Sequence, residues 1–132
     1  MKTFIKRLLP GSDLKGEIEK IVSDQNIKAG CILSLVGSLH GATLRIADGE
    51  TVKSWDDDFE IVSGIGTLSI NGCHIHVALG DKQGNVIGGH LKQGCVVNTT
   101  VELIIGIFEN KEFVRRPDGA TGYDELEVLD KQ

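Results

Sequence analysis

The stretch CHIHVALGDKQGNVIGGHL, residues 73–91, has the pattern of two short β-strands joined by a tight turn. Polar and apolar side chains alternate within residues 73–79, as they do in a strand with one buried face. Asp, Gly and Asn within residues 81–85 favour a reversal of the chain, and residues 86–91 supply a returning strand. We therefore expect an antiparallel hairpin here and a fold built largely from such pairs.

The chain from residue 29 onward has the same β-rich composition, because aliphatic and β-branched runs alternate with Gly, Asn and Asp. Asn71-Gly72 predicts a tight turn in which both central residues need a positive φ. We interpret the acidic run Asp56-Asp57-Asp58 as a charged loop. The further strands that we expect cover residues 4–9, 30–39, 41–47, 58–70 and 96–108, with a flexible turn at 115–126 and an amphipathic piece at 125–129.

One helix is expected near the N-terminus, with Ser12 as its cap and its end near Asn26. Its apolar stripe has helical spacing and consists of Leu14, Ile18, Ile21 and Val22. The predicted fold class is α+β, or α/β in the wider sense, with one main packed helix.

Composition limits the classes of protein to which the chain can belong. The length of 132 residues fits one domain, residues 1–132. The net charge of −5 disfavours direct binding to DNA. Three widely spaced cysteines (Cys31, Cys73 and Cys95) indicate neither a disulfide framework nor a zinc ribbon and fit a cytoplasmic location. Because we find no signal peptide and no membrane-spanning apolar run, we expect no membrane partner.

The histidines of the opening stretch are the candidate site. His74 and His76 lie two positions apart, so both project from the strand face opposite its apolar row. His90 follows the turn, where the antiparallel strand can bring it over the same face. Three imidazoles suit Zn²⁺ or another divalent transition metal, with one coordination position left open. The alternative is that these histidines are simply solvated, since a His-x-His pattern is short.

The remaining polar residues give weaker signals. We expect His40 to be a surface residue. Glu102, among aliphatic neighbours, has three interpretations: a solvent-facing residue, a hydrogen-bond partner of a histidine, or a general base. Thr99 and Thr100 fit ordinary strand packing better than nucleophilic catalysis.

Nearly the whole chain resembles the PPC domain, the plants-and-prokaryotes conserved domain. The resemblance is most specific in HIHVALGDKQGNVIGGHL and the following NTTVELII, and it extends to ILSLVGSLHGATLRI and GYDELEV. It implies a compact domain with a strongly bent, mostly antiparallel sheet, a packed helix and assembly as a homotrimer. Family members with three histidines resemble zinc proteins, and His74, His76 and His90 match those positions.

Two departures from the family pattern limit what the resemblance implies. Plant members use an Arg-Glu-Phe-x-Arg segment for partner binding, whereas this chain has DDFEI at residues 57–61. The chain also lacks the Arg-Gly-Arg core of an AT-hook, so the DNA-binding label often given to the family lacks its reading motif here.

Three functions remain open at this stage. The first is a trimeric zinc-binding domain with a DNA-associated, regulatory or small-molecule-sensing role. The second is a zinc-dependent hydrolase or lyase acting on a small molecule, with Glu102 or Asp81 handling protons. The third is direct DNA binding by the trimer, which the net charge opposes.

Overall fold

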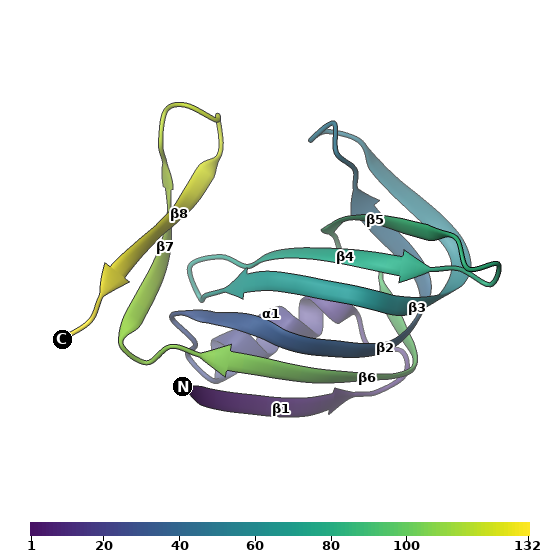
Figure 1. Cartoon of the computed structure of the whole chain (residues 1–132), viewed down its shortest axis with the longest axis horizontal. Helices are drawn as coiled ribbons and strands as arrows, with labels where there is room; N and C mark the ends of the chain where they lie inside the picture. The colour runs from purple at the N-terminus through teal and green to yellow at the C-terminus, as the bar shows by residue number, and fades with distance from the viewer.

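The computed structural model describes all residues, 1–132, and contains one α-helix and eight β-strands. In chain order these are β1 (Lys2–Leu8), α1 (Leu14–Asp24), β2 (Gly30–Arg45), β3 (Val52–Leu68), β4 (His74–Gly80), β5 (Val86–Leu91), β6 (Val96–Ile107), β7 (Lys111–Pro117) and β8 (Asp124–Asp130). All strand pairs are antiparallel. The predicted β-rich, mostly antiparallel fold with one helix is therefore confirmed (Figure 1).

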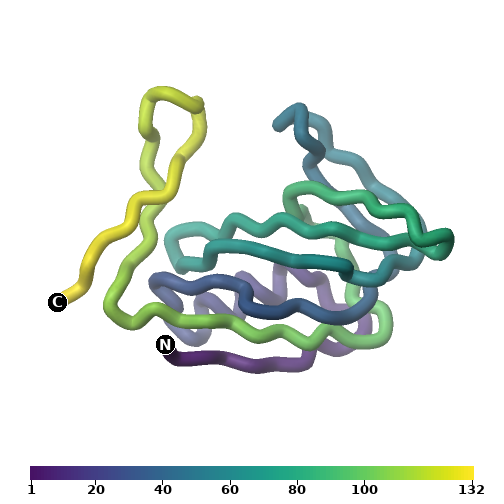
Figure 2. Tube along the Cα trace, in the orientation of Figure 1, coloured from purple at the N-terminus to yellow at the C-terminus, as the bar shows by residue number.

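Six strands form one sheet in the order β1-β6-β2-β3-β4-β5. The long β2 pairs with β6 and β3 and also, through its last residues, with β5. Leu44 lies opposite Leu91, and Arg45 lies opposite His90. The β5 edge of the sheet thus curls back to β2, a bend that the trace in Figure 2 shows.

Three register shifts interrupt the pairing of β2 without ending it, one of them between Ile32 and Ser34 and the other two near the predicted strand boundary. Register shifts occur next to Gly37 and at Gly41, so the two strands predicted at residues 30–39 and 41–47 are one continuous strand. At Gly37 the neighbouring strand is very close, because a Cβ added there would lie 2.0 Å from the carbonyl oxygen of Thr100. Glycine is the residue that permits such an approach.

The helix packs on one face of the sheet through its predicted apolar stripe. These four side chains are buried, and they are Leu14, Ile18, Ile21 and Val22. The predicted cap is wrong by one position: Asp13, with extended backbone, accepts a hydrogen bond from the Gly16 N–H at 2.9 Å. The Asp13 carboxylate also accepts from the Gly94 N–H at 2.8 Å, which ties the helix start to the turn before β6.

The Asn71-Gly72 turn has a different form from the one predicted. The Gly72 N–H donates to the Ser69 carbonyl oxygen at 3.0 Å, so Ile70 and Asn71 are the central residues of the turn. Only Gly72 of the predicted pair has a positive φ, 139°. The Asn71 side chain is used elsewhere, since it donates to the carbonyl oxygen of Phe113 at 2.9 Å.

The acidic run Asp56-Asp57-Asp58 belongs to β3 and is not a loop. Because β2 is so long, it offers backbone partners along this segment, where His40 lies opposite Asp58. Pairing with a neighbouring strand overrides the low strand propensity of aspartate.

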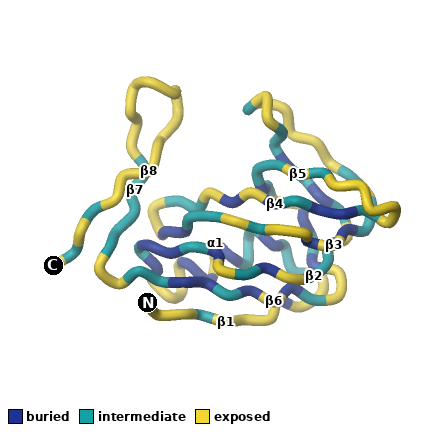
Figure 3. Tube along the Cα trace, viewed as in Figure 1, coloured by how far each residue is buried: buried dark blue, intermediate teal, exposed yellow.

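The β7–β8 hairpin is a separate two-stranded sheet that stands away from the main sheet (Figure 1). Its base is fixed at Phe113, whose N–H donates to the Lys28 carbonyl oxygen at 2.9 Å and whose carbonyl accepts from the Ser69 hydroxyl at 2.9 Å. Most of the hairpin is exposed to solvent (Figure 3).

Candidate metal centre

The β4–β5 pair brings His74, His76 and His90 together, and we call these three residues the histidine triad. His76 and His90 lie directly opposite each other in the pairing register. His74 lies two positions before His76, on the exposed face of β4, while Ile75 and Val77 between and after them are buried. The alternation that buries one face of β4 therefore also aligns the imidazoles on the other.

The spacing of the ring nitrogens suits a shared ion. The Nε2 atoms of His74 and His76 lie 3.0 Å apart, and one nitrogen from each of the three rings fits within a 4.8 Å spread. Two nitrogens bound tetrahedrally to zinc at about 2.0–2.1 Å are separated by about 3.3 Å. The ring nitrogens of the triad therefore lie near the separations needed to bind one zinc ion. Modest rotation of the rings would bring all three to that spacing.

Burial and nearby positive charge favour the neutral form of two triad histidines, His90 and His74. Burial lowers the pKa of His90 to about 4, with Arg45 as the next cause. Burial is also the largest cause that lowers the pKa of His74 below its ordinary value. The neighbouring His76 and then Arg115 lower this pKa further. Neutral imidazoles keep a nitrogen lone pair free, which is the form that binds a metal.

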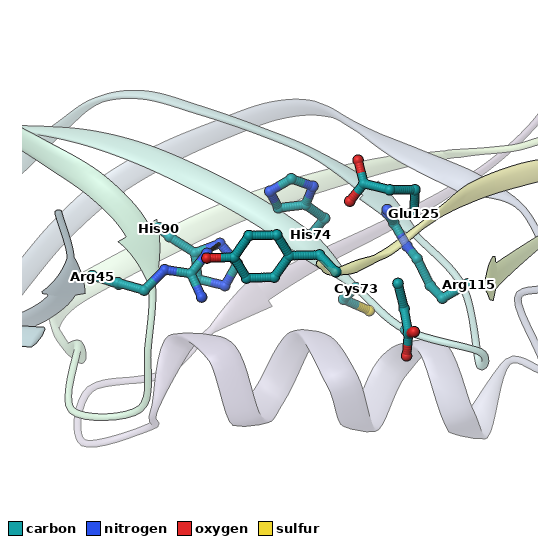
Figure 4. A pocket seen from close by; sticks show the side chains of 9 residues that line it. Arg45, Cys73, His74, His90, Arg115 and Glu125 are labelled. Carbon is teal, nitrogen blue, oxygen red and sulfur yellow. Dashed lines mark hydrogen bonds between the residues drawn. The ribbon is translucent and has the colours of Figure 1, made fainter. Parts of the chain in front are cut away.

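A cavity of about 290 Å³ opens beside the triad. Its walls come from β2, β4, β5 and the β7–β8 hairpin, and Figure 4 shows their side chains around the opening. The lining residues are Arg45, Gly72, Cys73, His74, His90, Arg115, Tyr123, Asp124 and Glu125. An ion held by the triad would thus lie at the wall of a space large enough for a small molecule.

The other candidate residues lie outside this centre. Neither Glu102 nor Asp81 borders a cavity that contains a triad histidine. Glu102 is exposed on β6, opposite Arg7 and Val36, and no histidine contacts it. Asp81 instead accepts hydrogen bonds from the backbone of its own turn. Within one chain neither carboxylate lies beside the triad, and of the three interpretations of Glu102 the structure agrees with the solvent-facing one.

His40, Thr99 and Thr100 also lie apart from the triad. His40 is a surface residue, as expected, and its Nδ1 lies 2.6 Å from the Asp58 carboxylate. The hydroxyl of Thr100 accepts a hydrogen bond from Arg7 at 3.0 Å, in keeping with a structural role.

Sequence reasoning missed Arg45, Arg115 and Tyr123. Arg45 reaches the centre through the β2–β5 pairing, which depends on the curl of the whole sheet. Arg115 and Tyr123 come from a hairpin whose position is fixed by contacts at its base. No local spacing links these residues to the histidines.

Comparison with known proteins identifies relatives of the whole chain and of its fold. The sequence pattern of the Plants and Prokaryotes Conserved (PCC) domain matches residues 1–109. The Bifunctional protein GlmU of Synechococcus sp. (strain JA-3-3Ab) is 43% identical over 128 residues, or 97% of this chain. The chain spans about a fifth of the length of that relative, 21%.

Two solved structures are similar over nearly their whole length. A hypothetical protein from Salmonella cholerae-suis has a TM-score of 0.96 and 37% identity, with 99% of this chain and 95% of that chain covered. A metal-containing protein from Archaeoglobus fulgidus has a TM-score of 0.84 and 31% identity, with 96% and 94% covered. No helix in the structure combines the length and the apolar character needed to cross a membrane.

Proposed function

The chain belongs to the Plants and Prokaryotes Conserved domain family, and from this premise we propose that it is a self-associating, metal-binding domain with a regulatory role. The observation that carries the proposal is the convergence of three imidazoles whose ligand atoms lie within 4.8 Å of one another. The metal-containing protein from Archaeoglobus fulgidus, with the same fold, supports it. Zinc is the favoured ion, because all-nitrogen ligation at tetrahedral spacing suits it.

In this proposal His74, His76 and His90 hold the ion through one ring nitrogen each. Three protein ligands leave one coordination position for water or for a bound molecule. The cavity of about 290 Å³ gives that position access to a small ligand. The centre therefore fits a domain that senses a small molecule as well as one in which the metal has a structural role.

Self-association is supported by exposed aliphatic side chains on the neighbouring strands β2 and β3. We call this group the apolar patch, and it consists of Leu33, Val36, Val62 and Ile65. A cluster of exposed aliphatic side chains of this kind marks an interface between proteins. Ile65 lies opposite His76 in the β3–β4 register, so the patch adjoins the triad. We propose that the assembly is a homotrimer.

The regulatory role is supported by the Synechococcus relative, in which the matching segment is 21% of a longer bifunctional protein. A unit of this size fits an accessory function beside other domains. We also propose that residues 110–132 belong to the same domain, because the similarity to the Salmonella structure extends over 99% of the chain.

The direct test is elemental analysis of tag-free protein purified without chelators, with His76→Ala beside the wild type. We expect about one zinc ion per wild-type chain. In His76→Ala we expect zinc affinity to fall at least about a hundredfold. Loss of a residue that only supports a ligand typically lowers metal affinity roughly 10–100-fold, and loss of a ligand itself should cost at least as much. His40→Ala is the matched control, because His40 is an exposed histidine outside the triad. Wild-type protein without metal, or His76→Ala with full metal, would contradict the proposal.

The cavity favours a second candidate, a zinc-dependent hydrolase or lyase for a small molecule. An ion bound by three imidazoles activates water for hydrolysis when one position is open. This candidate needs a proton-handling group, and the cavity wall offers Tyr123, Asp124 and Glu125. Turnover by wild-type protein that is absent from His76→Ala would favour the enzyme over the regulatory domain.

A further inference from the structure

Two arginines from different parts of the chain face the cavity beside the triad. Arg45 ends β2, and one of its terminal nitrogens lies 3.5 Å from Nδ1 of His90, at the limit of a hydrogen bond. Arg115 comes from β7 and donates to the Thr67 hydroxyl at 2.8 Å. Both side chains line the cavity, and Figure 4 shows them among its walls, with Arg45 beside His90.

Neither Arg45 nor Arg115 has a carboxylate partner within salt-bridge distance. Both are partly buried, which makes an unpaired guanidinium costly. The next residue gives the contrast: Arg116 is exposed, lies outside the cavity wall and pairs with Glu127 at 3.2 Å. The cavity wall thus holds two cations that no acidic side chain neutralises at salt-bridge distance. Arg115 uses one donor on the Thr67 hydroxyl, and the Arg45 guanidinium lies 6.0 Å from the centre of the Tyr123 ring.

The cavity wall also contains two acidic residues, Asp124 and Glu125, both exposed on β8. Their charges balance those of the two arginines. A divalent ion on the triad would leave a net charge of about +2 around the cavity. The combination suits an anion held by a guanidinium fork at one end and near the metal at the other.

From this arrangement we propose that the cavity binds a small oxyanion-bearing molecule, a carboxylate or a phosphate ester, with Arg45 and Arg115 as its anion-binding residues. The inference deepens the proposed function, because it names the ligand class of the same centre and relies on its ion for part of the attraction. It also assigns a role to the β7–β8 hairpin. The family pattern ends at residue 109, yet the hairpin supplies Arg115, Tyr123, Asp124 and Glu125 to the cavity. Ligand choice therefore depends on the hairpin together with Arg45, which lies within residues 1–109.

The test is isothermal titration calorimetry of zinc-loaded protein with inorganic phosphate and, separately, with succinate, at constant ionic strength. We expect the wild type to bind one of these probes at one site per chain. Arg45→Gln and Arg115→Gln should weaken binding by roughly tenfold or more, because each removes charged hydrogen bonds to the anion. Arg116→Gln is the matched control and should bind as the wild type does. Binding of phosphate alone indicates a phosphate ester as the natural ligand, and binding of succinate alone indicates a carboxylate.

Zinc content measured on the same samples separates this inference from the proposed function. If all four proteins hold zinc and neither probe binds, or if both variants bind like the wild type, the anion site is wrong while the metal centre stands. If the wild type holds no zinc, the metal centre is wrong, and the same titrations on that protein still test the arginines. Arg115→Lys tests whether lost binding in Arg115→Gln comes from misfolding, because lysine keeps the positive charge without the planar guanidinium. Anion affinity between that of Arg115→Gln and that of the wild type supports direct contact. Affinity no higher than that of Arg115→Gln contradicts direct contact.

Discussion

The pKa of a single side chain in this molecule can be set by a residue on the neighbouring strand, as His40 on β2 and Asp58 on β3 show. The exposed His40 shows this outside the metal centre, where its Nδ1 lies 2.6 Å from Asp58 and its ring also faces Asp56. The hydrogen bond and the charge of Asp58 hold the pKa of His40 above its ordinary value, and Lys82 acts in the opposite direction. The same hydrogen bond lowers the pKa of Asp58.

These shifts predict a pH dependence of folding stability. A raised histidine pKa stabilises the fold below its unfolded value of 6.5, and this contribution is lost as the pH rises through the folded value. The lowered pKa of Asp58 stabilises the fold above 3.8, its value when unfolded, and that part is lost in acid. We therefore expect His40→Asn to lower the free energy of unfolding at pH 6 and to change it less at pH 8, measured by urea unfolding.

The NMR titration of His40 gives an independent check on this contact. Lys82→Met removes the opposing charge and should raise the pKa of His40 further. A pKa of His40 at or below its ordinary value in the wild type would mean that the contact with Asp58 does not form in solution.

At the scale of elements, local pairing was predictable and long-range pairing was not. The β4–β5 hairpin follows from alternation and turn residues, so the approach of His90 to His76 follows from sequence as well. Arg45 was missed because its position opposite His90 depends on the bend of β2 and the closure of the sheet. The metal role of the triad stays a prediction, which rests on the geometry of the three rings and on the similarity to a metal-containing protein.

The helix start shows how tertiary contacts choose between adjacent capping residues. Sequence favoured Ser12, whereas Asp13 caps α1 and also binds the Gly94 N–H. We expect Asp13→Ala to lower the free energy of unfolding by about 1–2 kcal/mol, because it removes a helix cap together with a second hydrogen bond, from the Gly94 N–H. Ser12→Ala is the control and should have an effect within about 0.5 kcal/mol, as for a surface substitution. Equal losses in the two variants, measured by urea unfolding, would assign the cap to the wrong residue.

At the scale of the whole molecule, the single chain exposes apolar side chains that a partner could bury. The helix covers one face of the sheet, whereas the apolar patch of β2 and β3 has no cover. The β7–β8 hairpin also exposes large apolar side chains, among them Tyr123 and Val128. A homotrimer would bury such surfaces, and the position of Ile65 opposite His76 places the patch next to the metal centre.

The proposed trimer predicts different effects for two exposed valines of β3. Val62 in the apolar patch is 61% exposed, and Val52 at the start of the strand is 52% exposed. We expect the wild type and Val52→Lys to have three times the 14.2 kDa mass of one chain by light scattering. Val62→Lys should have the mass of one chain, because burying an unpaired ammonium in an interface costs several kcal/mol. A wild type with the mass of a single chain, or a Val62→Lys protein that remains a trimer, would refute this interface.

The zinc content of dissociated Val62→Lys chains then shows whether metal binding depends on the trimer. The triad lies within one chain, with its ligand atoms inside 4.8 Å, so a dissociated chain should keep its ion. Loss of the ion on dissociation would show instead that a neighbouring subunit supplies the fourth ligand or orders the histidines. In that case metal binding and assembly would stabilise each other, since a ligand that binds only the assembled state shifts the equilibrium toward it.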